Sequence, residues 1–254
     1  MIDIHSHILP NLDDGSQELH ESIEMARAAL LDGIHTIIAT PHHANGRYHN
    51  EAATVLQSVE ALNDRLKQEE IGVRILPGQE IRVYPNMIDD WNQLLTLQHS
   101  SYVLLELPSN EIPSYFLDLL HELRIMKVTP IIAHPERNQE IAKDPSKLLK
   151  FIELGALSQL TSHSITGLFG PKIQSLCFKL CENHLAHFIS SDAHNNTRRP
   201  FALQEAYSLI QAKLGSEYVS YLQSNAEKVV SNSIIDVHTP LWPKHKWFQF
   251  WKSS

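Results

Sequence analysis

The sequence predicts an α/β fold in which helices surround a parallel sheet, either open or closed into a barrel. Short runs of β-branched and apolar residues alternate about seven times with longer segments of helical periodicity. This alternation is typical of parallel strands joined by crossover helices. A chain of 254 residues can bury one sizeable core, and barrels of this size commonly form a single domain. No repeat or linker interrupts the pattern before about residue 232.

The expected strands are short and end close to polar residues. They are Ile2–His5, Ile34–Thr40, Val73–Leu76, Tyr102–Leu107, Val128–Ala133, Ala156–Leu160 and His187–Ser190. The expected helices include residues 22–33, Glu51–Glu70, Pro113–Met126, Pro145–Leu154, Pro171–Asn183 and Pro200–Leu214. Four of these helices start at a proline, where the missing N–H costs least. Ser16 is the expected N-cap of the first helix, with Glu18 and Glu21 near the positive end of its dipole.

Composition and charge narrow the class of protein. With 43% hydrophobic and 20% charged residues, the chain has the composition of an ordinary soluble protein. Its formal charge of -8 argues against a general nucleic-acid surface. Cys177 and Cys181 lie one helical turn apart and give no disulfide framework. Because the sequence shows neither a signal-peptide pattern nor an apolar transmembrane run, we expect a cytoplasmic protein.

Histidine and carboxylate side chains follow six of the seven expected strands. They are His5 and His7, His42 and His43, Glu80, Glu106, His134, and Asp192 with His194. Barrel enzymes build their active sites at this carboxyl-terminal face. Any one of these residues, such as His43, is equally well explained as a surface or capping residue. The whole set is not, so we expect a functional site there.

The donor types point to metal chemistry. Histidine and carboxylate ligation without thiolates suits Mn²⁺, Zn²⁺ or Fe²⁺, and nine candidate ligands are too many for one ion. A carboxylate such as Glu80 is suited to bridge two ions. Neighbouring metals activate water and neutralise charge on a transferring phosphoryl group. The sequence therefore predicts metal-assisted hydrolysis of a phosphate ester.

Residues in the flanking loops leave two choices open. Asp13 and Asp14 precede Gly15, and either is placed to act as a further ligand or simply to form a turn. Two arginines that follow ligand-bearing strands, Arg137 and Arg199, are expected to bind phosphate oxygens, with Arg198 as a competitor for the second role.

Other phosphatase and nucleotide-binding chemistries lack their motifs. A thiol-based phosphatase needs Cys-x5-Arg, but Asn183 and His187 stand six residues after the two cysteines. No Walker A or dinucleotide-binding glycine motif occurs in the sequence.

Six ordered segments resemble the PHP (polymerase and histidinol phosphatase) superfamily, and within it the bacterial tyrosine-protein phosphatases of the CpsB/YwqE type. The segments are MIDIHSHILP with DDG, IIATPHH, LPGQEIR, LLELP, IIAHPER and SDAHN. The resemblance covers residues 1–232. Loops 46–50 and 108–112 depart from it, which bears on substrate preference.

The resemblance implies a distorted seven-stranded (β/α) barrel that holds three divalent cations, usually manganese. The implied ligands are His5, His7, Asp14, His42, Glu80, Glu106, His134, Asp192 and His194. Arg137 and Arg199 match the arginines that hold the substrate phosphate. The implied substrate is phosphotyrosine on a bacterial tyrosine kinase that regulates capsule or exopolysaccharide synthesis. The alternatives are a small-molecule PHP phosphatase, acting on histidinol phosphate or a nucleotide, and a non-catalytic metal-binding scaffold that docks the kinase.

Residues 233–254 read as a C-terminal tail of basic and aromatic character. The residues concerned are Trp242, Lys244, Lys246, Trp247, Phe248, Phe250, Trp251 and Lys252. Such a segment can lie at a membrane surface, fold back over apolar surface of the domain, or be disordered. The sequence leaves these three alternatives open.

Overall fold

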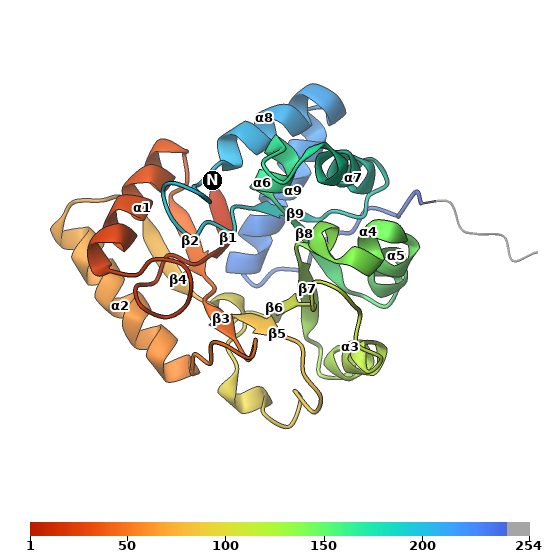
Figure 1. Ribbon diagram of the computed structural model, residues 1–254, viewed down its shortest axis with the longest axis horizontal. Coiled ribbons are helices and arrows are strands. Elements are labelled where there is room, and N and C mark those ends of the chain that lie inside the picture. Colours follow the sequence, from red (N-terminus) through yellow and green to blue (C-terminus); the bar gives the residue numbers. More distant parts are fainter. Residues whose placement is uncertain (243–254) are drawn as a thin grey trace, which may run out of the picture.

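The computed structural model describes residues 1–242 and has an α/β fold with parallel strands. Within this part of the chain the strands form a sheet of order β1-β2-β4 and a sheet of order β3-β5-β6-β7-β8-β9. Their bounds are β1 (Ile2–Ser6), β2 (Thr36–Ala39), β3 (His42–His43), β4 (Arg74–Pro77), β5 (Glu80–Arg82), β6 (Tyr102–Glu106), β7 (Thr129–Ala133), β8 (Leu157–Thr161) and β9 (Phe188–Ser190). Helices surround the strands (Figure 1).

Two short strands were not predicted. β3 and β5 follow β2 and β4 after gaps of two residues, and His42 pairs with Glu80 in parallel register. Pro41 has no N–H to extend the first ladder. Gly78 lies so close to the neighbouring strand that an added Cβ would be 2.9 Å from Cγ2 of Ile38. A short additional strand therefore follows each of the expected second and third strands and carries a polar residue into the centre.

Backbone hydrogen bonds join the two sheets at the carboxyl end of β1. The His7 N–H donates to the Ala193 carbonyl at 2.9 Å, and the Asp192 N–H donates to the His5 carbonyl at 2.9 Å. On the other side of β1, the Thr40 N–H donates to the Ser6 carbonyl at 2.9 Å. The segment after β9 thus lies beside the end of β1, although nearly 190 residues separate them.

The helices in the described residues include several that were not predicted. Their bounds are α1 (Leu19–Leu31), α2 (Ala52–Gln68), α3 (Phe116–Ile125), α4 (Gln139–Lys143), α5 (Ser146–Glu153), α6 (Ser162–Thr166), α7 (Pro171–Glu182), α8 (Leu203–Leu214) and α9 (Ser216–Val230). The helix α9 was missed, as were the five-residue helices α4 and α6. The prediction of Ser16 as the first N-cap is wrong, because Glu18 occupies that position. The Ser16 hydroxyl donates instead to the Glu18 carbonyl and accepts from Ser22.

Apolar side chains of the strands meet on one common face beneath their carboxyl ends. The cluster contains Ile4, Ile38, Leu76, Leu104, Ile131, Leu157 and Phe188, and Ala226 and Val229 of α9 close it. A larger cluster fills the space between the strands and the outer helices. Burying such side chains stabilises the fold by about 1.5–3 kcal/mol each. This packing fixes the strand ends, which carry the polar residues.

The described part of the tail folds back on the domain. The Tyr102 hydroxyl donates to the Ser233 carbonyl at 2.7 Å, and the Leu241 N–H donates to the Asn183 carbonyl at 3.0 Å. Residues 233–242 thus take the fold-back alternative. Most of the basic and aromatic residues behind the membrane hypothesis lie outside the described residues, namely Lys244, Lys246, Trp247, Phe248, Phe250, Trp251 and Lys252.

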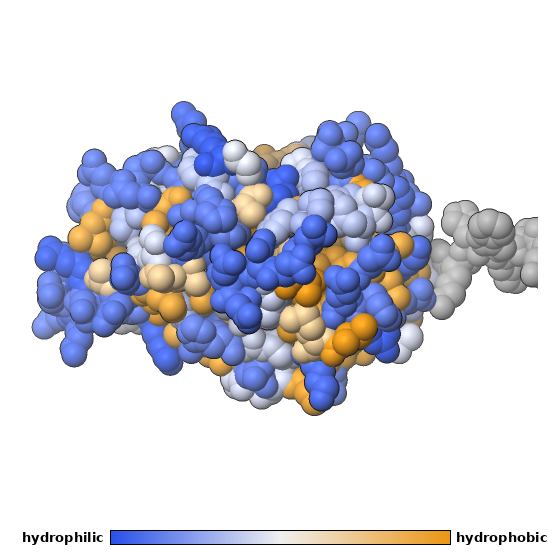
Figure 2. Space-filling model, turned by 90° about the horizontal axis from the view of Figure 1, so that it is seen from below, coloured by the Kyte–Doolittle hydropathy of each residue, from blue (hydrophilic) through white to orange (hydrophobic). Residues whose placement is uncertain are grey.

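Neither the described surface nor the two cysteines indicate a further functional site. Seen from below, the surface is mainly hydrophilic with small separate hydrophobic areas (Figure 2), as is normal for protein surfaces. Among residues 1–242, no helix has the length and apolar character that crossing a membrane requires. Cys177 and Cys181 are free and buried on α7, one helical turn apart.

Candidate metal centre

The strand ends bring nine histidine and carboxylate side chains into one cluster. Within residues 1–242, the groups of at least three such side chains with ligand atoms inside 4.8 Å of one another are made from nine residues. They are His5, His7, Asp14, His42, Glu80, Glu106, His134, Asp192 and His194. These are the nine residues that the family resemblance implied as ligands. Their convergence depends on β3 and β5, which carry His42 and Glu80 inward.

The geometry inside the cluster suits cations better than hydrogen bonds. Nδ1 of His42 lies 2.8 Å from Oε2 of Glu80, yet neither buried atom has a partner in hydrogen-bonding geometry. Nε2 of His5 lies 3.2 Å from Nε2 of His7 and 3.5 Å from the same Glu80 oxygen. Buried polar atoms without partners are costly. Lone pairs that converge in this way fit divalent cations, and the donor set suits Mn²⁺, Zn²⁺ or Fe²⁺.

Two histidines have their outer nitrogens fixed by neighbours. Nδ1 of His5 donates to Oε1 of Gln159 at 2.8 Å, and Nδ1 of His7 donates to Oδ2 of Asp13 at 2.6 Å. In the neutral imidazole each bond holds the proton on Nδ1 and directs the Nε2 lone pair at the cluster, as metal-ligating histidines require. Gln159 was not predicted, because it lies inside an expected strand without a ligand-type side chain.

Asp13 and Asp14 have different surroundings. Asp13 is buried and accepts the backbone N–H of both Gly15 and His42 at 2.9 Å. Asp14 instead lies with Oδ1 3.4 Å from Nε2 of His42 and 3.6 Å from Nε2 of His194. The turn needs Gly15, since a Cβ there would be 2.0 Å from the His7 carbonyl oxygen. Asp13 therefore orients His7, whereas Asp14 faces the cluster.

His43 does not join the cluster. Its Nδ1 lies 2.7 Å from the Asn50 carbonyl oxygen, and its ring centre lies 4.4 Å from that of His49. His43 is therefore explained by these local contacts and not by a place in the cluster.

Burial and charge set the protonation of the cluster. Burial, with the nearby Arg137 charge, lowers the pKa of His134 to about 4. Burial and the neighbouring His7 lower the pKa of His194 to about 4. Burial alone would raise the pKa of Glu80, but His5, His42 and His134 outweigh it and hold that pKa well below its usual range. Burial alone would also lower the pKa of His5, His7 and His42, but the neighbouring carboxylates outweigh it and raise the pKa of all three. Neutral imidazoles and ionised carboxylates are the forms that bind metal ions, so cation binding at these three histidines releases protons.

Both predicted phosphate-binding arginines contact one carboxylate of the cluster. Nη1 of Arg137 lies 2.5 Å from Oδ2 of Asp192, and Nη2 of Arg199 donates to the same oxygen. Nη1 of Arg199 also donates to Nε2 of His194 at 2.9 Å. Two guanidinium groups that converge on one oxygen are suited to hold a single anion. The side chain of Arg198 is exposed, and the described part of the chain gives it no ion pair.

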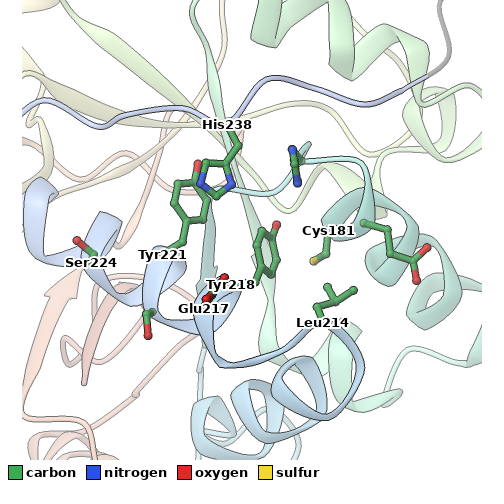
Figure 3. Close-up of a pocket in the computed structure, with 10 residues that line it drawn as sticks. Cys181, Leu214, Glu217, Tyr218, Tyr221, Ser224 and His238 are labelled. Carbon is green, nitrogen blue, oxygen red and sulfur yellow. The ribbon is translucent and has the colours of Figure 1, made fainter.

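A separate pocket of about 580 Å³ opens beside α9 and the segment that precedes β9. Figure 3 shows Tyr218 and Tyr221 of α9 with His238 and Cys181 around it. The Tyr218 hydroxyl donates to the carbonyl of Ala186, two residues before β9 begins. This pocket shares no residue with the histidine cluster, so it lies apart from the reactive groups.

The fold and the cluster together define the class of protein. It is an α/β protein with a candidate metal-binding site at the carboxyl ends of its parallel strands. The family model for capsular polysaccharide synthesis, CpsB/CapC, matches residues 1–231. The chain belongs to this family, which confirms the resemblance inferred from the sequence.

Named relatives span almost the whole chain. The tyrosine-protein phosphatase YwqE of Bacillus subtilis is 47% identical over 237 residues, covering 92% of this chain and 93% of the relative. The putative tyrosine-protein phosphatase CapC of Staphylococcus aureus is 38% identical over 252 residues, covering 98% and 99%. A chain from crystal structures of YwqE and Streptococcus pneumoniae CpsB, described as unique metal-dependent tyrosine phosphatases, superposes with a TM-score of 0.94 at 46% identity and covers 96% of this chain and 100% of its own.

Proposed function

We propose that this protein is a metal-dependent protein-tyrosine phosphatase. The observation that carries the proposal is the convergence of nine imidazole and carboxylate groups beside two guanidinium groups. The names of the relatives support phosphotyrosine as the substrate. The family's link to capsular polysaccharide synthesis supports a bacterial tyrosine kinase of that system as the phosphorylated partner.

We infer that His5, His7, Asp14, His42, Glu80, Glu106, His134, Asp192 and His194 hold the cations, with manganese and a count of three as the expectation. Bound cations supply positive charge to the phosphoryl group and make a water molecule easier to deprotonate. Glu80 is suited to bridge, because its two oxygens lie near different histidines, His134 for one and His42 for the other. We interpret the two sheets, which join at the end of β1, as one distorted barrel. Counting β2 with β3 as one strand, and β4 with β5 as another, gives the barrel seven strands. The barrel domain comprises residues 1–232, and residues 233–254 follow it as a C-terminal tail.

Arg137 and Arg199 bind and orient the phosphate. In the structure both donate to Asp192, so their guanidinium groups already point at the edge of the cluster. A phosphate bound at this edge would offer both guanidinium groups further acceptors beside Asp192. Their positive charges also stabilise the negative charge that builds up on the phosphoryl oxygens in the transition state.

Hydrolysis of a phosphotyrosine peptide, compared with histidinol phosphate, tests the proposal. A protein-tyrosine phosphatase has the larger kcat/KM for the peptide, and the activity requires a divalent cation. Turnover of histidinol phosphate without turnover of the peptide would establish the small-molecule alternative. A kinase-docking scaffold would turn over neither substrate with any divalent metal.

A further inference from the structure

A tight turn between α6 and α7 carries a partly buried aromatic ring near the cluster. Gly167 and Gly170 have φ of 90° and 93°, and the Gly170 N–H donates to the Gly167 carbonyl at 2.9 Å. Leu168 and Phe169 occupy the two central positions, and Leu168 is 55% exposed. Positive φ favours glycine at both ends of the turn, so the backbone presents Phe169 in a defined place.

Phe169 lies against one of the two phosphate-binding arginines. Cζ of Arg137 is 5.4 Å from the centre of the Phe169 ring. The His163 ring packs edge-on against Phe169, with ring centres 6.0 Å apart at an angle of 72°. His163 is buried and follows β8, the strand that brought no predicted ligand. The ring is therefore supported from the protein side and lies next to the guanidinium group.

A buried carboxylate fixes this arrangement. Oε1 of Glu136 accepts from the Thr161 N–H at 3.0 Å and from the hydroxyl of Ser164 at 2.7 Å. Glu136 immediately precedes Arg137, and Ser164 lies in α6, which leads into the turn. Gln174 braces the turn from α7 by donating to the Ile165 carbonyl at 2.8 Å. These bonds set the distance between the Arg137 backbone and the segment that carries Phe169.

We propose that Phe169 is a specificity-determining residue that packs against the aromatic ring of the substrate. This inference rests on the proposed function. In phosphotyrosine the ester oxygen is bonded directly to the ring, so a phosphate held by Arg137 brings that ring beside Phe169. Phosphoserine and inorganic phosphate offer no ring to this surface. Aromatic pairs with centres 4.5–7 Å apart in offset or edge-on geometry gain free energy beyond their buried area.

Tyr48 is the rival aromatic residue at the site. Its ring lies parallel to that of His42, with centres 6.2 Å apart, and Cζ of Arg47 lies 5.0 Å from its centre. Tyr48 thus adjoins His42 of the cluster and Arg47, which is not one of the two phosphate-binding arginines. Phe169 is favoured because it adjoins Arg137, which contacts the cluster through Asp192.

The test compares kcat/KM for a phosphotyrosine peptide with the inhibition constant of inorganic phosphate, which has no ring. Phe169→Ala and Phe169→Leu are expected to lower kcat/KM for the peptide about 3- to 10-fold, while Phe169→Tyr retains it. The inhibition constant of phosphate is expected to change less than about twofold. Phe178→Ala is the matched control, since Phe178 lies on α7 under Lys213 with 4.3 Å between Nζ and the ring centre.

Three outcomes would overturn the proposal. If phosphate inhibition weakens as much as peptide turnover, Phe169 acts by holding Arg137 and not by contacting the ring. Full activity of Phe169→Leu would mean that aromatic character is irrelevant. Loss of peptide turnover in Tyr48→Ala, with none in Phe169→Ala, would assign the ring to Tyr48. An unmodified protein that turns over no phosphotyrosine peptide contradicts the proposed function itself, which is a distinguishable result.

Discussion

Oδ2 of Asp13 accepts a hydrogen bond of 2.6 Å from Nδ1 of His7. The bond keeps the proton on Nδ1 and leaves the Nε2 lone pair for the cluster. Asp13→Asn is expected to lower the affinity for divalent cations about 10- to 100-fold, because the amide can donate to Nδ1 and favour the wrong tautomer. Titration of metal-free protein with Mn²⁺ measures this. The exposed Asp118→Asn is the control, and equal affinity in the two variants would refute the role of Asp13.

Arg199 and its neighbour Arg198 offer a matched pair of substitutions. Arg199 donates to Asp192 and to His194, whereas Arg198 is exposed. Arg199→Ala is expected to lower kcat/KM for a phosphotyrosine peptide about 10- to 100-fold, since hydrogen bonds to charged groups are worth about 1.5–3 kcal/mol. Arg198→Ala is expected to change it less than about twofold. Metal content, measured on both variants, should stay that of the unmodified protein. Loss of metal from Arg199→Ala would assign that residue to the metal site.

Chelation and thiol alkylation are expected to have opposite effects on activity. Removing divalent cations should abolish hydrolysis, and adding Mn²⁺ should restore it. Iodoacetamide should leave the rate almost unchanged, because both cysteines are buried and burial raises the pKa of Cys181 to about 12. Inactivation by alkylation, with activity resistant to chelator, would point to a thiol mechanism.

His187 makes the stability of the fold depend on pH. Burial, with the nearby His238 and His184, lowers the pKa of His187 to about 3. An unfolded histidine titrates near 6.5, so the unfolded chain gains a proton that the folded chain resists. The free energy of unfolding should therefore fall as pH falls from about 6.5 toward 3. The slope from this residue is up to about 1.4 kcal/mol per pH unit.

His187→Asn should reduce that slope, whatever it does to stability at pH 7. Urea unfolding at pH 7, 6 and 5 measures it. His20→Asn, at an exposed position of α1, is the control and should keep the slope of the unmodified protein. An unaltered slope in His187→Asn would mean that other groups carry the acid sensitivity.

Much of the site was predictable because most of its histidine and carboxylate residues belong to strand ends. In a parallel fold the carboxyl ends of all strands meet at one face, so a residue such as His134 can be placed from the end of its apolar run alone. Asp13 and Asp14 were not separable by spacing, since both belong to one turn. Their difference depends on which oxygen reaches the His7 ring and the His42 backbone, which is a tertiary relation.

The unpredicted parts depend on contacts between segments distant in sequence. β3 and β5 are too short to show a strand pattern, and exist because Glu80 pairs with His42 across the sheet. Gln159 and Glu136 have ordinary positions in the sequence. Their roles appear only when β8 lies beside His5 and α6 beside the segment after β7. The helix α9 was missed, although its buried residues Val219, Leu222, Ala226 and Val229 recur at helical spacing.

Metal analysis of purified active protein, beside Glu80→Ala, tests the central claim most directly. The cluster is expected to hold more than one divalent cation per chain. In Glu80→Ala the metal content should fall together with turnover of phosphotyrosine peptide, because Glu80 lies within reach of His5, His7, His42 and His134. Protein free of metal and fully active would contradict the account.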